Sequence, residues 1–493
     1  MKRRMFIKNQ IIVKIILIIS LFFSTVIVGH YLIYLKKSKQ PNVILITIDS
    51  LRPDHLSCYG YKRNTSPNID SLAKEGVIFT HAITQAPFTV SSVSSFITSS
   101  YPYMNLVNLE QKEVYLNTKV STLPFISERN GYKTAVFTDH FIIGQPVGLN
   151  TDSANFTQIK KNSPDRLTQL SLKWLRENKN RKFFLWIYYY GAHYDYKPSL
   201  PYSDIFFNDG LFKIHKNIPI STGIADGIFG VIPKNIAENN ITDVNYYIAR
   251  YDGKIRIIDD QIGLLLQEVK KIDLDKNTVI ILIADHGESL GEHNLYFNHG
   301  YDLYDELIKV PLIIRYPNSM SKNKIIDCQV QLIDVMPTIL DILNIKTKNI
   351  YMQGRSLMPY ILGEKCYTQK YAFSEIAGSI FCIRSENYKL IYVDRESLTK
   401  IPLPQIPHLL NYYSDEYYLY DLKNDHFETH NLIYNENILF ENLKQELNKY
   451  INKAKYQALE NKKPVQKHYI KDKTIGYPNE ETKEEMKSLG YAQ

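Results

Sequence analysis

Residues 279–287 read VIILIADHG, an apolar and β-branched run that ends in Asp285 and His286. Polar and apolar residues do not alternate along it, which is typical of a strand that is buried on both faces. The chain contains four similar runs: VILITID (43–49), TAVFTD (134–139), FFLWIYYY (183–190) and PLIIRY (311–316). Strands of this kind predict a mostly parallel sheet that is covered by helices on both sides.

Helical segments lie between these strands. In SPNIDSLAKEG (66–76), Ser66 suits the N-cap, Pro67 the first helical position and Gly76 the stop. The run VQLIDVMPTILDIL (330–343) predicts a second helix. The alternation of strands and helices predicts an α/β fold of the doubly wound type, in which ligands bind beyond the carboxyl ends of the strands.

Two further regions differ from this pattern. Residues 199–245 are irregular, with scattered Gly, Asn and Pro, and indicate a long insertion or an active-site loop. Beyond residue 370 the runs YKLIYV (388–393) and EYYLYDL (416–422) alternate, and a charged helix is expected over 430–460. We therefore expect a main domain over residues 41–370 and a smaller α+β subdomain, with an antiparallel sheet and helices, over residues 371–493.

The charge of the chain is concentrated at its start. The 493 residues are 44% hydrophobic and 22% charged, as in globular proteins, and the net charge is +8. Residues 1–40 contain eight Lys or Arg and no acid, so the remainder is neutral (8 − 8 = 0). A nucleic-acid-binding protein keeps its basic patch on the folded domain, so this distribution argues against nucleic acid as a partner.

The same segment, residues 1–40, contains an apolar stretch. Ile15–Leu35 has 21 residues without a charge, and a helix of that length spans about 31 Å, enough to cross a bilayer. The alternative is a cleaved secretory signal, but no small-x-small cleavage pattern follows the run. We expect an uncleaved, single-pass anchor in the cell membrane, with a cytoplasmic tail and everything after Lys39 outside the cytoplasm.

The four cysteines are Cys58, Cys328, Cys366 and Cys382, and their spacing does not match that of metal ligands. Disulfides in an exported domain are one interpretation. The other is that these residues are small buried hydrophobic side chains.

Three of the predicted strands end in a carboxylate, namely Asp49, Asp139 and Asp285, and His286 follows the last of them. Carboxylate and imidazole groups at a strand end suit a divalent cation. An Asp-His-Gly triplet alone also fits a hydrogen-bonded turn. Asp49, at the end of another buried strand, shifts the balance towards a metal site.

These motifs resemble the sulfatases and their relatives in the alkaline-phosphatase-like superfamily. The resemblance spans residues 41–493, with a weak region near 199–245. It is carried by NVILITIDSLRPDHLSCYGYKRNTSPNIDSLAKEGVIFTHAIT (42–84), TVIILIADHGESLGEHNLYFNHGYDLYDELIKVPLIIRYP (278–317), LIDVMPTILDIL (332–343), QGRSLMPYILG (353–363), YLYDLKNDHFETHNL (418–432) and EEMKSLGYAQ (484–493). It implies an alkaline-phosphatase-like core with a mostly parallel sheet between helices.

The resemblance also implies roles for individual residues. Asp49, Asp285 and His286 match metal ligands of the family. His193, in YYYGAHYDYKPS, matches a histidine that touches the anionic group or the leaving oxygen of the substrate, and the alternative is a hydrogen-bonded core histidine. His299, in FNHGYDLYDE, matches a substrate-site histidine of the branch that uses a threonine nucleophile.

The hydroxyl-rich run QAPFTVSSVSSFITSSYP (85–102) contains the position of the nucleophile. Sulfatases carry Cys or Ser, any residue, Pro, any residue and Arg, with Leu-Thr-Gly placed so that its Thr is nine residues after the nucleophile. Thr98, in ITS, sets this register and places Thr89 at the nucleophile. Because Ser91 and Val93 replace the family's Pro and Arg, no formylglycine is expected.

A threonine at this position resembles the branch of phosphoethanolamine and phosphoglycerol transferases and phosphodiester hydrolases. Its hydroxyl needs activation, and coordination to the metal would supply it, which makes Thr89 a fourth ligand. The residues that follow are expected to begin a helix whose free amides face the anion.

Other positions also depart from the sulfatase pattern. Ser50 replaces the second Asp of the first metal strand, His140 is displaced by one position from the family histidine, and Asn298 replaces a lysine. We expect His140 and Asn298 to contact the substrate. No Asp-x-x-x-His pair occurs at His193, so one divalent metal is expected, with Mn, Mg, Zn and Ca all open.

The sequence therefore predicts a membrane-anchored, metal-dependent hydrolase or transferase of the sulfatase family. Thr89 would attack a phosphoester, or a phosphonate or sulfate ester, and form a covalent intermediate. The substrate would be an anionic ester, with an envelope glycan or lipid as one source. Two alternatives stay open: a sulfuric ester hydrolase that works without formylglycine, and a catalytically degenerate binding protein with the same fold.

Overall fold

The structure is a computed structural model of the chain. It describes residues 40–462 except 108–114, 117–119, 141, 145–155, 160–161, 208–215, 224–227, 318–321, 365–369, 402–404 and 435–436. The chain divides into two units, Met1–Pro41 and Asn42–Gln493, and the fold is that of the second.

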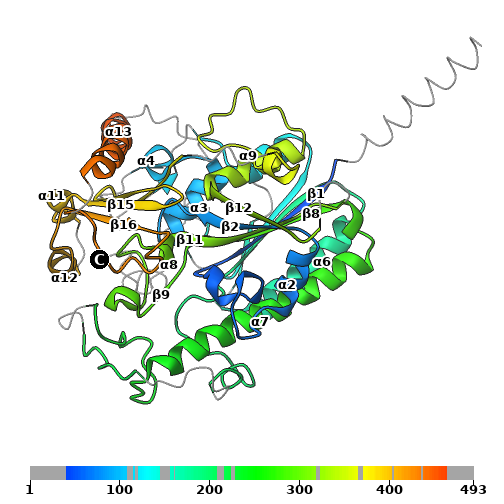
Figure 1. Cartoon of the computed structure of the whole chain (residues 1–493). Helices are drawn as coiled ribbons and strands as arrows, with labels where there is room; N and C mark the ends of the chain where they lie inside the picture. Colours follow the sequence, from blue (N-terminus) through cyan, green and yellow to red (C-terminus); the bar gives the residue numbers. More distant parts are fainter. Residues whose placement is uncertain are drawn as a thin grey trace, which may run out of the picture. The chain divides into compact units, whose positions relative to one another are not determined.

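A single eight-stranded sheet forms the centre of the second unit (Figure 1). Every neighbouring pair is parallel except those of β11, which runs antiparallel to both β2 and β8. In spatial order the strands are β12 (Lys324–Gln331), β2 (Val77–Ile83), β11 (Lys309–Arg315), β8 (Thr278–Ala284), β1 (Asn42–Ile48), β7 (Phe183–Tyr189), β5 (Lys133–Thr138) and β6 (Phe156–Gln158).

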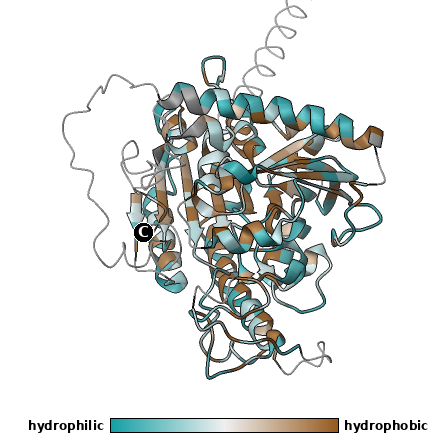
Figure 2. Cartoon of the chain, turned by 90° about the vertical axis from the view of Figure 1, so that its left-hand side faces the viewer, coloured by the Kyte–Doolittle hydropathy of each residue, from teal (hydrophilic) through white to brown (hydrophobic). Residues whose placement is uncertain are grey.

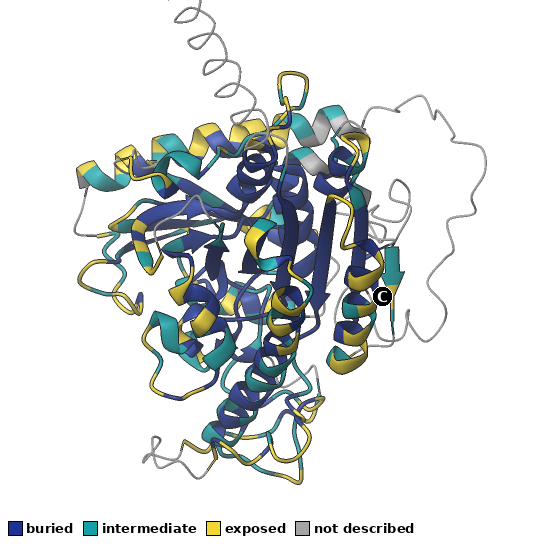
Figure 3. Cartoon of the chain, turned by 90° about the vertical axis from the view of Figure 1, so that its right-hand side faces the viewer, coloured by how far each residue is buried: buried dark blue, intermediate teal, exposed yellow. Residues whose placement is uncertain are grey.

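Helices cover both faces of this sheet. On one side α2 (Pro67–Lys74), α6 (Pro164–Asn178) and α7 (Val244–Lys271) pack together, and on the other α3 (Thr89–Thr98) packs against α5 (Leu123–Arg129) and α9 (Val335–Ile342). The strands β1, β7 and β8 are buried along their whole length (Figure 3). Apolar residues are concentrated in the strands, whereas the helices alternate apolar and polar residues (Figure 2). This is the arrangement expected when both faces of a parallel sheet are covered.

A second, antiparallel sheet lies in the C-terminal part of the chain. Its order is β13 (Ala372–Ile376), β14 (Ile380–Arg384), β15 (Tyr388–Val393) and β16 (Tyr417–Asp421), and α13 (Asn437–Lys462) packs on β14 and β15. The first strand is attached to the loop before α3, because Ser374 Oγ donates to Thr84 O (2.5 Å) and Glu375 N donates to Gln85 O (3.0 Å).

The remaining elements are short. They are α4 (Pro102–Asn105), β3 (Leu106–Val107), β4 (Tyr115–Leu116), β9 (Ser289–Leu290), β10 (Tyr296–Asn298), α8 (Asp305–Ile308), α10 (Met358–Ile361), α11 (Arg395–Leu398) and α12 (Ile406–Tyr412), together with 3₁₀ turns at Pro53–His55, Ser57–Tyr59, Asp275–Asn277, Glu292–Asn294 and Leu332–Asp334.

The predicted strands and the α/β class are confirmed. All five apolar runs are strands of the one central sheet, and Pro67 is the first residue of α2. Ser66 occupies the N-cap position of α2, but its side chain does not cap a helix amide and instead donates to the Asp70 carboxylate. The 28-residue helix α7 was not predicted, although Asp243 is its N-cap and accepts from Asn245 N, because its start lies within the stretch 199–245 that the sequence indicated as irregular.

Some predictions concern residues outside the described part. The apolar segment Ile15–Leu35 and the motif EEMKSLGYAQ (484–493) both lie outside it. Among the described residues no helix combines the length and apolar character needed to cross a membrane. Of the cysteines, Cys328 is disulfide-bonded, whereas Cys58 and Cys382 are free.

Candidate active site

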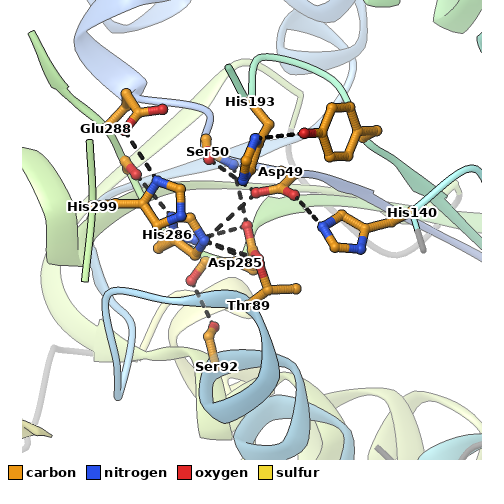
Figure 4. Close-up of polar contacts among 12 residues, drawn as sticks. Asp49, Ser50, Thr89, Ser92, His140, His193, Asp285, His286, Glu288 and His299 are labelled. Carbon is orange, nitrogen blue, oxygen red and sulfur yellow. Dashed lines mark hydrogen bonds and ion pairs between the residues drawn. The ribbon is translucent and has the colours of Figure 1, made fainter. Parts of the chain in front are cut away.

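The ends of the two central strands β1 and β8 bring the first candidate residues together. These strands are parallel and in register, with Ile48 opposite Ala284, so the next residues, Asp49 and Asp285, lie side by side at the carboxyl edge of the sheet. Both side chains are fully buried. His286 follows directly, and Figure 4 shows all three converging with Thr89.

Three oxygen-bearing side chains surround one nitrogen of His286. Its Nε2 atom lies 3.3 Å from Thr89 Oγ1, 3.5 Å from Asp49 Oδ1 and 3.4 Å from Asp285 Oδ2. Thr89 is the first residue of α3, and Phe88 at the N-cap provides no side-chain bond to the helix. The first amides of α3 therefore lack intrahelical partners close to this group.

The hydrogen bonding of His286 fixes which nitrogen can act as a ligand. Nδ1 lies 2.8 Å from Gly287 O, and since a carbonyl only accepts, Nδ1 carries the proton. Nε2 then presents its lone pair to the three oxygens. A carbonyl that holds the other ring nitrogen in this way is typical of metal-binding histidines.

The residues present fit a divalent cation. The Asp49 carboxylate is fully buried, and its Oδ2 atom lies 3.0 Å from His140 Nε2. Burial, and next the charge of Asp285, raise the pKa of Asp49 well above its usual range, although His286 and His299 act in the opposite direction. Two buried carboxylates, a hydroxyl and an imidazole lone pair form a donor set that suits such a cation, and its charge would offset this repulsion.

A second group, formed by Asp49, His140 and His193, is also compact enough to hold a metal. His140 Nε2 lies 3.0 Å from Asp49 Oδ2. However, the backbone amide of Ile142 donates to His140 Nδ1 (3.0 Å), so the proton of a neutral ring is on Nε2, facing Asp49. His140 is therefore placed to orient the Asp49 carboxylate, and the group with Asp285 and His286 is the better candidate for the cation.

His193 and His299 lie beside this group, with ring centroids 4.9 Å apart. Burial, and then the neighbouring His299, lower the pKa of His193 well below its usual value. Burial is the largest influence on the pKa of His299 and lowers it, but the charge and hydrogen bond of Glu288 and the charges of Asp49 and Asp285 together raise it above its usual value. Two adjacent imidazoles whose pKa values are shifted in opposite directions are suited to acid–base catalysis.

Each of these two histidines has a fixed partner. His193 Nδ1 lies 2.8 Å from the Tyr190 hydroxyl, and His299 Nδ1 lies 3.1 Å from Glu288 Oε1. Glu288 is fully buried, and its other oxygen accepts from Tyr196 (2.9 Å). The Asn298 side chain accepts from the backbone amide of His299 (3.0 Å), so it supports the same turn.

The other hydroxyls near Thr89 have different roles. Ser92 Oγ donates to Asp285 O (2.6 Å) and lies 2.8 Å from Thr84 Oγ1, which ties α3 to the end of β8. Ser94 donates to the carbonyl of Val90, one turn earlier in the helix (2.6 Å). The hydroxyl that contacts His286 is that of Thr89, at the position that the spacing to Thr98 predicts.

Three contacts of this site were not predicted. Tyr188, on β7, donates to Asp285 Oδ2 (2.8 Å), Glu288 holds His299, and Ser92 anchors α3. In the run FFLWIYYY every residue is buried, so nothing in the pattern separates Tyr188 from its neighbours. Asp139, by contrast, follows the last residue of β5 and accepts hydrogen bonds from the backbone amides of Tyr190 (2.7 Å) and Ser163 (2.9 Å).

Comparison with known proteins identifies the family. A family model described as Sulfatase matches residues 41–345, and one described as N-sulphoglucosamine sulphohydrolase, C-terminal, matches residues 291–401. An N-acetylglucosamine-6-O-sulfatase of Bacteroides thetaiotaomicron is 22% identical, over 80% of this chain and 83% of its own length. An arylsulfatase of Clostridium perfringens is 24% identical, over 65% of this chain and 78% of its own.

Solved structures share the fold at low identity. A protein in complex with its substrate D-glucosamine-2-N,6-O-disulfate has a TM-score of 0.65 and 19% identity, and the match covers 86% of this chain and 100% of that chain. The phosphonate monoester hydrolase of Agrobacterium radiobacter has a TM-score of 0.63 and 18% identity, covering 85% and 96%. The α/β core with a smaller C-terminal sheet is therefore the fold of these proteins.

Proposed function

This chain belongs to the sulfatase family, and from that premise we propose that it is a metal-dependent ester hydrolase that cleaves a sulfate ester with Thr89 as its nucleophile. The observation that carries the proposal is the convergence of Thr89, Asp49 and Asp285 on one lone pair of His286. Relatives named for sulfated sugars, such as the N-acetylglucosamine-6-O-sulfatase, make a sugar sulfate the first class to test.

The proposed chemistry assigns a task to each group. Asp49, Asp285, His286 and Thr89 would hold a divalent cation, which lowers the pKa of the threonine hydroxyl and offsets negative charge on the ester. The free amides at the start of α3 bind the anionic group. His193 and His299 move protons.

Both steps balance. Thr89 Oγ forms a bond to the sulfur, the bond from sulfur to the ester oxygen breaks, and the threonine proton is transferred to the departing alcohol through the imidazoles. Water then attacks the sulfur, the bond to Thr89 Oγ breaks, and the hydroxyl regains a proton from that water. The products are an alcohol and inorganic sulfate.

A phosphate or phosphonate ester is the second candidate, and Thr89 itself favours it. A sulfated threonine lacks the second hydroxyl through which formylglycine expels sulfate, so its release needs direct attack by water. A phosphorylated threonine is open to such attack at phosphorus. Asn298 also stands where sulfatases carry a lysine that holds the sulfate. The relatives nevertheless favour the sulfate ester over the phosphoester that the sequence predicts.

Purified protein with added Mn²⁺ separates these possibilities. Turnover of nitrophenyl sulfate supports the proposal, and turnover of only bis-nitrophenyl phosphate or nitrophenyl phenylphosphonate selects the second candidate. Thr89→Ala is expected to abolish turnover, whereas Ser94→Ala, in the same helix, leaves it unchanged. Accurate intact mass of stalled enzyme identifies a sulfo or phospho group on Thr89. If the protein binds Mn²⁺ and a sulfated sugar but turns over no ester, it is a binding protein.

The apolar stretch Ile15–Leu35 and the positive charges that flank it predict a membrane anchor, with the site outside the cytoplasm. An anchored hydrolase outside the cytoplasm would act on envelope glycans or lipids, with transfer to one of their hydroxyls as a variant of the second step. Protease treatment of intact cells tests the topology, because an outward-facing domain is degraded while a cytoplasmic control protein survives.

A further inference from the structure

Tyr188 contacts two of the candidate catalytic groups from a neighbouring strand. It is the penultimate residue of β7, which lies on one side of β1, whereas β8 lies on the other. Its hydroxyl donates to Asp285 Oδ2 at 2.8 Å and also interacts with the side chain of Thr89. The phenol therefore reaches across the end of β1 to the candidate metal ligand and to the candidate nucleophile.

The Asp285 carboxylate is held by a small set of donors. Oδ1 accepts from the backbone amides of Ser50 (3.3 Å) and His286 (2.9 Å), and Oδ2 accepts from Tyr188. Within the described part of the chain, Tyr188 is the side chain that donates a hydrogen bond to this carboxylate. Because Oδ2 is also the oxygen 3.4 Å from His286 Nε2, the phenol acts on the atom that faces the candidate cation position.

The single phenolic proton defines the direction of these bonds. A carboxylate oxygen only accepts, so the phenol is the donor in the 2.8 Å bond to Asp285 Oδ2. That proton is donated to Asp285, and the phenol oxygen accepts from Thr89. The lone pairs of Thr89 Oγ1, like that of His286 Nε2, are then left for the candidate cation.

We propose that Tyr188 is a positioning residue that orients the Asp285 carboxylate and the Thr89 hydroxyl together for metal binding and attack. The claim that Tyr188 supports the attack by Thr89 rests on the proposed function. The claim that Tyr188 supports metal binding rests only on its hydrogen bond to Asp285. Groups that orient a metal ligand from outside are worth about 10–100-fold in metal affinity.

Tyr189 provides a matched control. It is adjacent on β7, equally buried, and its side chain points to the opposite face of the sheet, where its hydroxyl lies 2.8 Å from that of Thr168. Tyr189→Phe removes one buried hydroxyl bond, as Tyr188→Phe does, but the hydroxyl of Tyr189 bonds to Thr168 and to none of the candidate catalytic groups.

The test compares the two variants with the wild type. Mn²⁺ affinity of chelator-treated protein is measured by calorimetry, and kcat and KM are measured on whichever nitrophenyl ester the wild type hydrolyses best. Tyr188→Phe is expected to weaken Mn²⁺ binding by about 10–100-fold and to lower kcat with little change in KM, while Tyr189→Phe leaves affinity, kcat and KM near wild type. Replacement of Tyr188 by para-aminophenylalanine, which keeps a donor at the same place, is expected to restore Mn²⁺ affinity.

The outcomes separate this inference from the proposed function. If the wild type binds Mn²⁺ but cleaves none of the esters, the proposed function is wrong, and the comparison of Mn²⁺ affinities still tests the role of Tyr188. Wild-type Mn²⁺ affinity in Tyr188→Phe, or an equal loss in Tyr189→Phe, overturns the role of Tyr188. If Tyr188→Phe does not fold, the para-aminophenylalanine variant decides, because a loss of Mn²⁺ affinity in that folded protein contradicts the donor role.

Discussion

Replacing Glu375 with Gln should stabilise the protein at alkaline pH. Glu375 lies on β13 and is 2% exposed; one carboxylate oxygen accepts from Tyr450 (3.1 Å), whereas the other has no hydrogen-bond partner among the described residues. Burial, only partly opposed by hydrogen bonds from the Tyr450 side chain and the Tyr103 backbone, raises its pKa from 4.5 to about 7. The difference of about 2.5 units (7 − 4.5) corresponds to roughly 3 kcal/mol at 1.36 kcal/mol per unit.

The sign follows from proton binding. Because the folded-state pKa is raised, the folded protein binds more protons than the unfolded chain between pH 4.5 and about 7. The contribution of Glu375 to stability is therefore fully present below that interval and is lost as the pH rises through it. Gln keeps the volume and an acceptor for Tyr450 but cannot ionise. We expect Glu375→Gln to be about 3 kcal/mol more stable than wild type at pH 8 and within about 1 kcal/mol at pH 4.5.

Urea denaturation at the two pH values measures this difference. Glu396→Gln is the control, because the Glu396 side chain is 84% exposed and its replacement should change the free energy of unfolding by less than about 0.5 kcal/mol at either pH. Equal stability of Glu375→Gln and wild type at pH 8 would refute the reasoning. So would a gain of the same size at pH 4.5.

Three other outcomes follow from the site. Removing divalent metal with a chelator should lower the melting temperature. Mn²⁺ added at about 100 times its Kd should raise the free energy of unfolding by about 2.7 kcal/mol in the wild type but not in Asp285→Asn. Glu288→Gln should lower kcat with a smaller change in KM, because a neutral amide holds His299 less firmly than the carboxylate does. An unchanged kcat would contradict the role of Glu288 in holding His299. Gly287→Ala should lower the melting temperature strongly, since its Cβ would meet Glu306 O at 1.9 Å, whereas Gly223→Ala, with open space around it, should not.

The sequence predicted the strand ends better than the contacts between them. Asp49, Asp285 and His286 stand directly after buried apolar runs, and parallel strands place such positions at one edge, so their proximity follows from local pattern alone. Thr89 needed the resemblance to a family, because its register depends on Thr98. Its place as the first residue of α3 agrees with that register.

The roles of the residues that were missed depend on the tertiary arrangement. Tyr188 and Asp285 are 97 positions apart, and their bond depends on the order β7-β1-β8, which strand patterns do not specify. Glu288 is close to His299 in the chain, but its role depends on how the turn between β9 and β10 folds back. Hydrophobic periodicity determines burial, whereas the partner of a buried polar atom depends on the tertiary arrangement.

The bonds from β13 to the loop before α3 have a consequence for the newly made chain. Thr84 and Gln85 leave the ribosome long before Ser374 and Glu375, which hold them, are added 290 positions later (374 − 84). At about 5–20 residues per second, that interval lasts roughly 15–60 s. During translation the loop before α3 is therefore made before the strand that hydrogen-bonds to it. A chain that stops before β13 would carry every candidate ligand and the bond from Ser92 to Asp285, but it would lack the two bonds from β13 to the loop before α3.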